Sequence, residues 1–233
     1  MGSLTELIKE IIYPSGIKCI VCGCELDKTV RNCVCDKCKL PLITEYCTVC
    51  GRAVPPQNAV CDNCKQREYP FSAARSSFEY NGGAAKLVHR LKYRDARYLA
   101  PYMAEYMADT YYSANWKPDI ITSVPVHKSR RRTRGYNQSE LLACELAKRI
   151  GIESEVLLAK TVKTKDLVGQ SRAEREETVK DSFALSEKAD VKAKSVLLID
   201  DVFTTGSTAA ECSRVLIKNG AAEVFVLTFA SVK

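Results

Sequence analysis

The sequence predicts an α/β protein in which a parallel sheet flanked by helices follows a small cysteine-rich module. Ten of the twelve cysteines lie within the first 64 residues, mostly as CxxC pairs. Farther along, short apolar runs alternate with amphipathic segments, a pattern typical of strands and helices in turn. Because the expected strands are apolar throughout, both faces of the sheet should be covered, as in parallel sheets. The predicted boundary separates residues 1–66 from residues 67–233.

The first module is predicted to begin with an amphipathic helix over residues 3–13 that ends at Pro14. Residues 17–66 contain too few apolar side chains to form a core, so a structural metal is expected to stabilise them. A weak internal repeat runs through this segment, since the motifs CIVCG and CDKC recur as CTVCG and CDNC. This repeat predicts two tandem zinc ribbons.

Two CxxC pairs separated by about a dozen residues are typical of a tetrahedral zinc site. The repeat predicts one such site in each copy, although pairing between the copies also fits the spacing, so one or two zinc ions are expected. Cys33 is an alternative ligand at the first site, whereas Cys24, Cys144 and Cys212 are expected to bind no metal. The predicted ligands are Cys19, Cys22, Cys35 and Cys38 at the first site, and Cys47, Cys50, Cys61 and Cys64 at the second.

The elements of the α/β domain are predicted in an order that suits a parallel sheet. The helix that begins near Asn137 has Glu140 as a capping-box partner and ends at Gly151. The segment 160–174 is polar and is expected to be mobile. The predicted strands are 73–80, 119–125, 155–158, 195–200 and 223–229, and the predicted helices are 83–93, 98–114, 137–150 and 207–219.

A strand, two acids, a small-residue loop and a helix follow one another in residues 195–211, SVLLIDDVFTTGSTAAE. N–H groups at the start of a helix bind phosphate, and the glycine and hydroxyls of the loop favour a close approach. Asp200 and Asp201 would repel phosphate but suit sugar hydroxyls or magnesium. The segment therefore predicts a ribose 5-phosphate site at the carboxyl end of a strand, and an ordinary strand–turn–helix is the alternative. The loop residues are Thr204, Thr205, Gly206, Ser207 and Thr208.

A second polar segment, VPVHKSRRRTRGYNQS, follows the strand predicted at 119–125 and has five basic residues between Lys128 and Arg134. Because it leaves a strand of the same sheet, its cations are expected to meet a pyrophosphate group. Contact with nucleic acid and a solvated surface are the alternatives. No Ser–His–Asp or Cys–His arrangement is identifiable in the sequence.

Residues 196–208, VLLIDDVFTTGST, resemble the phosphoribosyl-pyrophosphate (PRPP) signature of type I phosphoribosyltransferases. The resemblance implies that Asp200 and Asp201 hold the ribose 2′ and 3′ hydroxyls of Mg²⁺-bound PRPP, and that residues 204–208 hold its 5′-phosphate. It also implies that a loop of Val126, His127 and Lys128 binds pyrophosphate through backbone amides. During catalysis, Lys128, Arg130 and Arg134 are the candidates for stabilising the leaving charge.

The polar segment 161–183 resembles the mobile loop that closes over the reacting centre in that family. Lys163, Gln170 and Arg175 are its candidate functional residues. A plain exposed connector is the alternative interpretation.

The order of the motifs along nearly the whole chain resembles the ComF family of competence proteins. The cysteine-rich module is followed by LVHRLKYRDARYLA at 87–100, then by the basic segment, and then by the PRPP signature. The resemblance implies a zinc finger joined to a phosphoribosyltransferase domain. It also implies participation in DNA uptake during natural transformation, beside a helicase-like ATPase partner.

Charge and hydropathy exclude other classes of protein. The formal net charge is +7, but eight zinc-bound thiolates would lower it to about +3, so basicity is local. No apolar run approaches the roughly 18–20 residues that cross a membrane, and the first residues do not resemble a signal peptide. We therefore expect a cytoplasmic protein without membrane insertion, in which clustered cysteines bind metal instead of forming disulfides.

Three functional hypotheses follow from the sequence. The first is an enzyme that transfers a phosphoribosyl group from PRPP and releases pyrophosphate. The second is a non-catalytic adaptor that senses PRPP or binds single-stranded DNA. The third is a protein–protein adaptor built on the zinc module.

Overall fold

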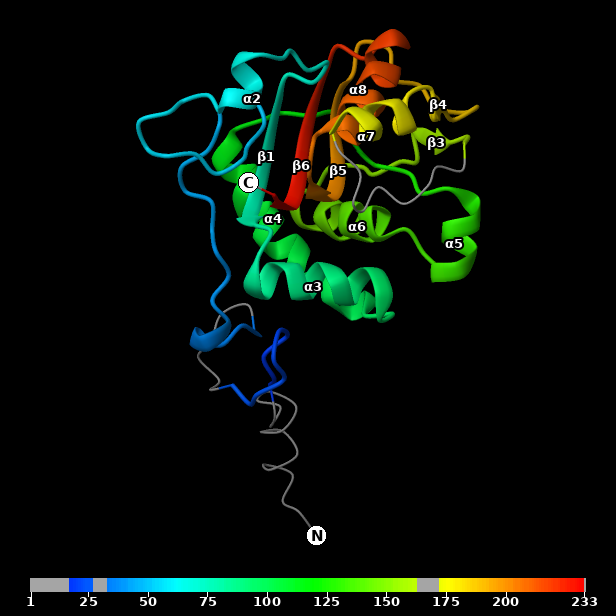
Figure 1. Ribbon diagram of the computed structural model, residues 1–233. Coiled ribbons are helices and arrows are strands. Elements are labelled where there is room, and N and C mark those ends of the chain that lie inside the picture. The colour runs from blue at the N-terminus through cyan, green and yellow to red at the C-terminus, as the bar shows by residue number, and fades with distance from the viewer. Residues whose placement is uncertain (1–16, 27–32, 163–171, 233) are drawn as a thin grey trace.

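The computed structural model describes residues 17–26, 33–162 and 172–232, and within them a four-stranded parallel sheet forms the centre of the molecule (Figure 1). The strand order is β1-β6-β5-β2. All three strand pairs run parallel, which confirms the predicted sheet. The strands are β1 (Ala73–Glu79), β2 (Ile120–Ser123), β5 (Ser195–Phe203) and β6 (Glu223–Ser231).

Helices cover both faces of this sheet (Figure 1). One face carries α3 (Gly82–Tyr93), α4 (Ala100–Ala114) and α6 (Gln138–Ile150), and the other carries α7 (Arg172–Val179) and α8 (Ser207–Lys218). The basic helix α5 (Lys128–Arg134) follows β2, beyond its carboxyl end. The remaining elements are two 3₁₀ turns, η2 (Asp36–Cys38) and η3 (Arg97–Leu99), the short helix α2 (Asp62–Lys65), and an antiparallel pair of β3 (Leu158–Lys160) and β4 (Phe183–Leu185).

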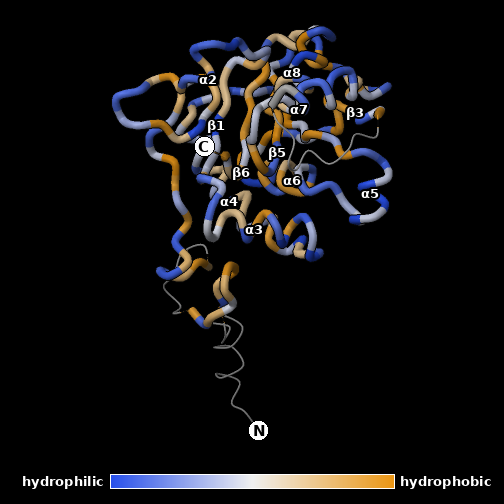
Figure 2. Tube along the Cα trace, viewed as in Figure 1, coloured by the Kyte–Doolittle hydropathy of each residue, from blue (hydrophilic) through white to orange (hydrophobic). Residues whose placement is uncertain are grey.

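The two central strands, β5 and β6, are apolar along most of their length (Figure 2). Alternate side chains of β5 enter two different cores. Leu197 and Ile199 pack with α3, α4 and α6, whereas Val196 and Leu198 pack with α8. Because both faces are buried, the sequence of these strands is continuously apolar and does not alternate.

Several elements differ from the sequence expectation. Residues 128–134 form a helix although they have no apolar periodicity. The helix is defined by its caps, since His127 is the N-cap and Gly135 adopts the left-handed conformation at the C-cap. The strand expected at 155–158 is displaced, since Ser154 bridges β2 and the chain then leaves to form β3 with β4. Short elements such as β4 and α7 are absent from the prediction because they lack a periodic signal.

The helix cap at Asn137 also differs in one detail. The Asn137 side chain accepts a hydrogen bond from the Ser139 N–H at 3.1 Å, as an N-cap should. Glu140 does not complete the capping box but pairs with Arg131 of α5, with Nη1 3.2 Å from Oε2. The acid therefore ties α5 to α6.

The cysteine-rich segment packs on the sheet domain at two separate places. Cys19 and Leu40 belong to the core that contains buried residues of α3 and α4. Cys47 and Cys50 belong to the core that contains buried residues of α8. The chain between them, residues 41–43, runs antiparallel to β1 and covers this edge of the sheet. The predicted boundary at residue 66 stays a prediction, and the predicted helix 3–13 lies outside the described residues.

Among the helices of residues 17–26, 33–162 and 172–232, none combines the length and the apolar character that crossing a membrane requires.

Candidate functional site

The loop of residues 204–208, here called the phosphate loop, connects the carboxyl end of β5 to the start of α8. Gly206 is the N-cap of α8 and has a φ of +82°. A Cβ atom at this position would lie 2.7 Å from Phe203 Cζ and 3.0 Å from Tyr69 Cε1, so the loop requires glycine for both its conformation and its space. The packing of Phe203 and Tyr69 against the loop thus fixes its shape.

Hydroxyl groups and backbone amides gather at this loop, where the Ser207 N–H donates to Thr205 Oγ1 at 3.4 Å. Thr205 Oγ1 lies 2.8 Å from Ser207 Oγ. The first N–H groups of α8 have no acceptor within the helix, as at the start of any helix, and they carry the positive end of its dipole. The loop therefore has the donors and the charge that suit a phosphate group.

The two acids lie in β5, directly before the loop, and their positions differ. Asp200 accepts hydrogen bonds at Oδ1 from the Ser139 hydroxyl and from the Asp201 N–H, both at 2.8 Å. Asp201 is only 2% exposed, and its Oδ2 lies 2.8 Å from Lys92 Nζ of α3. Asp200 is thus held by α6 and by its own strand, whereas Asp201 is paired with α3. That both acids hold one sugar diol stays a prediction.

Asp200 is the strongly perturbed acid of this region. Burial, reinforced by the neighbouring Asp201 carboxylate, raises the pKa of Asp200 to about 7. The Lys92 ammonium and the Ser139 hydroxyl act in the opposite direction. Asp200 therefore changes its charge near neutral pH, a property common among functional carboxylates.

A cationic region lies near Asp200. Burial, and then the charge of Arg130, lowers the pKa of Lys160 at the end of β3, while Asp200 acts against this shift. The mutual influence of these three groups indicates that α5, β3 and the carboxyl end of β5 share one electrostatic region. Arg130 is thus the cation of α5 whose charge lowers the pKa of Lys160.

The predicted pyrophosphate segment connects β2 to α5. Val126 and His127 are partly exposed and Lys128 is exposed. The His127 ring accepts from the Ser129 N–H at 3.2 Å, so it caps α5. Arg134, the other predicted catalytic cation, donates to Gln138 and lies over the Tyr93 ring, 5.4 Å from its centroid.

Of the predicted mobile segment 161–183, residues 163–171 lie outside the described residues, and residues 172–179 form helix α7. Lys163 and Gln170 lie in the first of these two ranges, and the Arg175 side chain is also outside the described residues although its backbone belongs to α7. Their proposed role stays a prediction.

The structure groups the eight predicted cysteine ligands by repeat: cluster one is Cys19, Cys22, Cys35 and Cys38, and cluster two is Cys47, Cys50, Cys61 and Cys64. Within each cluster the four sulfur atoms lie within 4.8 Å of one another. The Sγ atoms of Cys22 and Cys35, and those of Cys50 and Cys61, are each 3.7 Å apart. A tetrahedral zinc with Zn–S bonds of about 2.3 Å requires sulfur–sulfur distances of about 3.8 Å. Both clusters therefore fit zinc.

Comparison with known proteins gives the family. Residues 134–232 match the model of the phosphoribosyl transferase domain, a range that includes Asp200, Asp201 and the whole phosphate loop. The chain is 30% identical to competence protein F of Haemophilus influenzae, over 91% of this chain and 95% of that protein. It is also 30% identical to DNA utilization protein YhgH of Salmonella typhi, over 83% of this chain and 94% of that one.

The chain belongs to the ComF family. The solved structure of glutamine PRPP amidotransferase from Bacillus subtilis shares 22% identity with this ComF-family chain, covering 64% of it and 28% of the amidotransferase, with a TM-score of 0.37. The match to the domain model and the two relatives, and not this structural likeness, identify the ComF chain as one with a phosphoribosyltransferase domain behind a cysteine-rich segment.

Four residues of the ComF site are absent from the sequence prediction. Lys92 and Ser139 contact the two acids, whereas Arg52 and Tyr69 contact the phosphate loop. Arg52 directly follows the CxxCG motif of cluster two, but its target is 152 residues away in sequence. Nothing in the local pattern predicts such a contact, because it depends on how the cysteine module packs on the sheet.

Proposed function

We propose that this protein binds Mg²⁺-PRPP and transfers its phosphoribosyl group with release of pyrophosphate, as a component of DNA uptake. The observation that supports this proposal most strongly is the junction of β5 and α8. There the partly buried Asp200 carboxylate and the hydroxyl-lined start of a helix lie at the end of the same strand. A ribose 5-phosphate needs both: an acceptor for sugar hydroxyls and a set of donors for phosphate. The names of the two relatives support the role in DNA uptake.

In the proposed reaction, the bond between C1 of the ribose and the pyrophosphate oxygen breaks, and the electron pair leaves with the pyrophosphate. The acceptor nucleophile forms the new bond to C1. The N–H groups of the phosphate loop hold the 5′-phosphate, so that C1 is fixed relative to the cations near β2. Lys128, Arg130 and Arg134 are the proposed groups that stabilise the leaving charge.

Magnesium, which the fold family implies, fits the chemistry of this strand end. Asp200 offers a partly exposed carboxylate, and Mg²⁺ is commonly bound by one or two carboxylates together with substrate phosphates and water. When bound, the ion would neutralise part of the pyrophosphate charge. The chain's own contribution is to orient the Asp200 carboxylate through Ser139 and the Asp201 N–H.

The proposal is tested by measuring PRPP affinity by calorimetry in the wild type and in the double variant Asp200→Asn, Asp201→Asn. Binding should be abolished while the zinc content, measured by metal analysis, stays unchanged. Unaltered PRPP affinity in the double variant would refute the site. Catalysis is tested separately by PRPP-dependent pyrophosphate release across a panel of bases, amines and nucleic acids.

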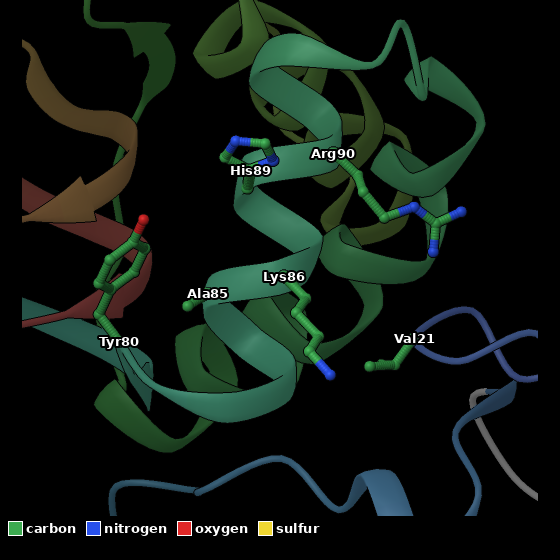
Figure 3. A pocket seen from close by; sticks show the side chains of 6 residues that line it. All are labelled: Val21, Tyr80, Ala85, Lys86, His89 and Arg90. Atoms are coloured by element: carbon green, nitrogen blue, oxygen red, sulfur yellow. The ribbon is translucent and has the colours of Figure 1, made fainter.

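A second proposed function, binding of single-stranded DNA, is favoured by the aromatic and basic surface around α3. Tyr93 and Tyr98 are 60% and 57% exposed, and arginines lie over or beside their rings. Single-stranded nucleic acids bind surfaces that combine stacking aromatic rings with cations along the backbone path. A depression of about 380 Å³ lies between α3 and the cysteine module and shares Arg90 with this surface (Figure 3). It is lined by Val21, Tyr80, Ala85, Lys86, His89 and Arg90.

The DNA-binding proposal predicts that affinity falls steeply with salt. The slope of the logarithm of the binding constant against the logarithm of the salt concentration should be about −0.7 for each phosphate contacted. Tyr93→Ala with Tyr98→Ala should weaken binding of a labelled oligothymidylate by roughly tenfold or more, since each stacked base contributes about 1–3 kcal/mol. The triple variant Arg130→Ala, Arg131→Ala, Arg132→Ala tests the contribution of α5. Full-strength binding of the oligothymidylate after both sets of changes would refute this surface as the DNA-binding site. A helicase-like ATPase stays a proposed protein partner.

A further inference from the structure

Cluster two does more than pack beside the sheet, because residues attached to it contact the phosphate loop directly. The Arg52 guanidinium donates through Nη2 to the carbonyl oxygen of Thr204. The backbone of Arg52 is part of the cysteine knuckle, since the Cys47 N–H donates to the Arg52 carbonyl at 2.8 Å. Arg52 therefore links the knuckle to the loop within a single residue.

The segment that follows cluster two supplies a second contact. The Tyr69 hydroxyl donates to the Thr205 carbonyl oxygen at 3.3 Å. The Tyr69 ring is stacked on Phe71 with centroids 4.6 Å apart, and Phe71 in turn meets the edge of Phe203. Packing thus holds the hydroxyl in place.

These two contacts fix the direction of two N–H groups. In a trans peptide the carbonyl and the N–H point in opposite directions across one plane. Because the Thr204 and Thr205 carbonyls point toward Arg52 and Tyr69, the N–H groups of Thr205 and Gly206 point the other way. Neither N–H has an acceptor among the residues that the structure describes. They are left as donors on the opposite side of the loop.

The charge of Arg52 adds to this effect. Arg52 is 7% exposed, and none of the described carboxylates lies within ion-pair distance of it. Its Nε has no hydrogen-bond partner in the described part of the chain. A buried guanidinium bonded to the Thr204 carbonyl polarises that peptide unit, which makes its N–H a stronger donor to an anion.

We propose that Arg52 and Tyr69 are positioning residues that orient the amides of the phosphate loop toward the 5′-phosphate of the ligand, so that cluster two is a working part of this site. The proposal rests on the proposed function, since it names how the same site recognises phosphate. It assigns the cysteine module a task in ligand binding that metal binding alone does not imply.

The test compares Arg52→Met and Tyr69→Phe with the control Arg75→Met. Arg75 also contacts the cluster-two segment, donating to the Thr48 carbonyl at 3.3 Å, but it has no contact with the loop. The ligands are ribose 5-phosphate, which needs the loop, and Mg²⁺-pyrophosphate, which does not. Amide hydrogen exchange of the peptide that spans residues 203–209 reports on the loop without any ligand.

The expected result is a selective loss of affinity for ribose 5-phosphate, by about tenfold to a hundredfold in Arg52→Met and about twofold to tenfold in Tyr69→Phe. Affinity for Mg²⁺-pyrophosphate, zinc content and all properties of Arg75→Met should stay near wild type. Exchange in the loop peptide should rise in both test variants, and Arg52→Lys should recover part of the loss because it keeps the charge.

Two outcomes would overturn the positioning role: unchanged ribose 5-phosphate affinity in both variants, or an equal loss for both ligands. A wild type that binds no ribose 5-phosphate would instead refute the proposed function. In that case loop exchange still decides whether Arg52 and Tyr69 hold the loop, and unchanged exchange would overturn this inference as well.

Discussion

Clusters one and two are both built from two CxxC pairs but have different surroundings. In cluster one Cys22 is exposed, and the cluster rests against α3, where Arg90 donates to the Ile20 carbonyl. In cluster two three of the four cysteines are buried, and the knuckle abuts β1 so closely that a Cβ on Gly51 would lie 2.5 Å from the Ala74 carbonyl oxygen. The spacing of cysteines predicts the metal, but only packing shows which cluster contacts the phosphate loop.

The largest expected difference separates Cys61→Ser from Cys35→Ser. These cysteines occupy equivalent positions in the two repeats, and each is partly buried and lies 3.7 Å from another thiol of its cluster. Each variant should lose one zinc, and Cys61→Ser should destabilise the fold on the order of 5 kcal/mol, since bound zinc contributes folding energy. Only Cys61→Ser should also weaken ribose 5-phosphate binding, by about tenfold or more. Metal analysis, denaturant unfolding and calorimetry measure these effects.

Equal losses of ribose 5-phosphate affinity in the two cysteine variants would contradict the comparison, because cluster one has no contact with the phosphate loop among the described residues. Chelation of zinc gives an independent check. It should raise amide exchange in residues 203–209, the same effect that is expected of Arg52→Met, even before any ligand is added.

The second prediction concerns Lys92, which lies at the end of α3 distant in sequence from both clusters. Burial alone would lower the pKa of Lys92, but the Asp201 carboxylate more than offsets this and raises it. Lys92→Met would leave Asp201 buried without its partner, at a cost of about 3–5 kcal/mol in unfolding free energy. Lys86→Met, an exposed position on the same helix, is the matched control and should change stability by less than about 0.5 kcal/mol. Similar values for the two variants would show that Asp201 does not depend on Lys92.

The sequence predicts local features of this molecule well and long-range contacts poorly. The apolar runs at 119–125, 195–200 and 223–229 each correspond to a strand, because burial on both faces leaves a direct record in composition. The spacing of the CxxC pairs likewise corresponds to the two clusters. Helix α5 is not predicted from the sequence pattern, because its ends are defined by caps and it has no hydrophobic face.

The contacts of Arg52, Tyr69 and Lys92 are of another kind. Each joins residues more than a hundred positions apart, and each uses a side chain type that is common on any surface. Only the packing of the cysteine module and α3 on the sheet brings them to the strand end. Without that arrangement in space, an arginine after a CxxCG motif carries no functional signal.

The third prediction concerns Asp200 and pH. Its pKa is raised to about 7 in the folded protein from an ordinary value near 3.8, so the folded state binds the proton more tightly. The contribution of Asp200 to stability is therefore most favourable below about pH 4 and is lost as the pH rises to about 7. Asp200→Asn keeps the acceptor for Ser139 but has no charge. It should stabilise the protein by about 1–4 kcal/mol above pH 7 and have little effect near pH 4.

Ligand binding should show the opposite trend with pH. Because the ionised carboxylate is the form that binds Mg²⁺, wild-type affinity for Mg²⁺-PRPP should fall about tenfold between pH 8 and pH 6 beyond any change in the ligand itself. Comparison with Mg²⁺-pyrophosphate titrated alone over the same pH range corrects for the ligand. A wild type whose stability relative to Asp200→Asn does not vary between pH 4 and pH 8 would show that Asp200 titrates normally.

The smallest expected effect belongs to Arg90, the counterpart of Arg52. Both arginines donate to a backbone carbonyl and thereby join a cysteine cluster to the sheet domain, but Arg90 reaches Ile20 of cluster one from α3. Since Arg90 is partly exposed and has Tyr98 beside it, Arg90→Met should cost less than about 1 kcal/mol in unfolding free energy. Ribose 5-phosphate affinity should not change in Arg90→Met, whereas it should fall in Arg52→Met. If Arg90→Met weakened ribose 5-phosphate as strongly as Arg52→Met does, the two clusters would act on the site in the same indirect way. Direct contact with the phosphate loop would then not be what distinguishes them.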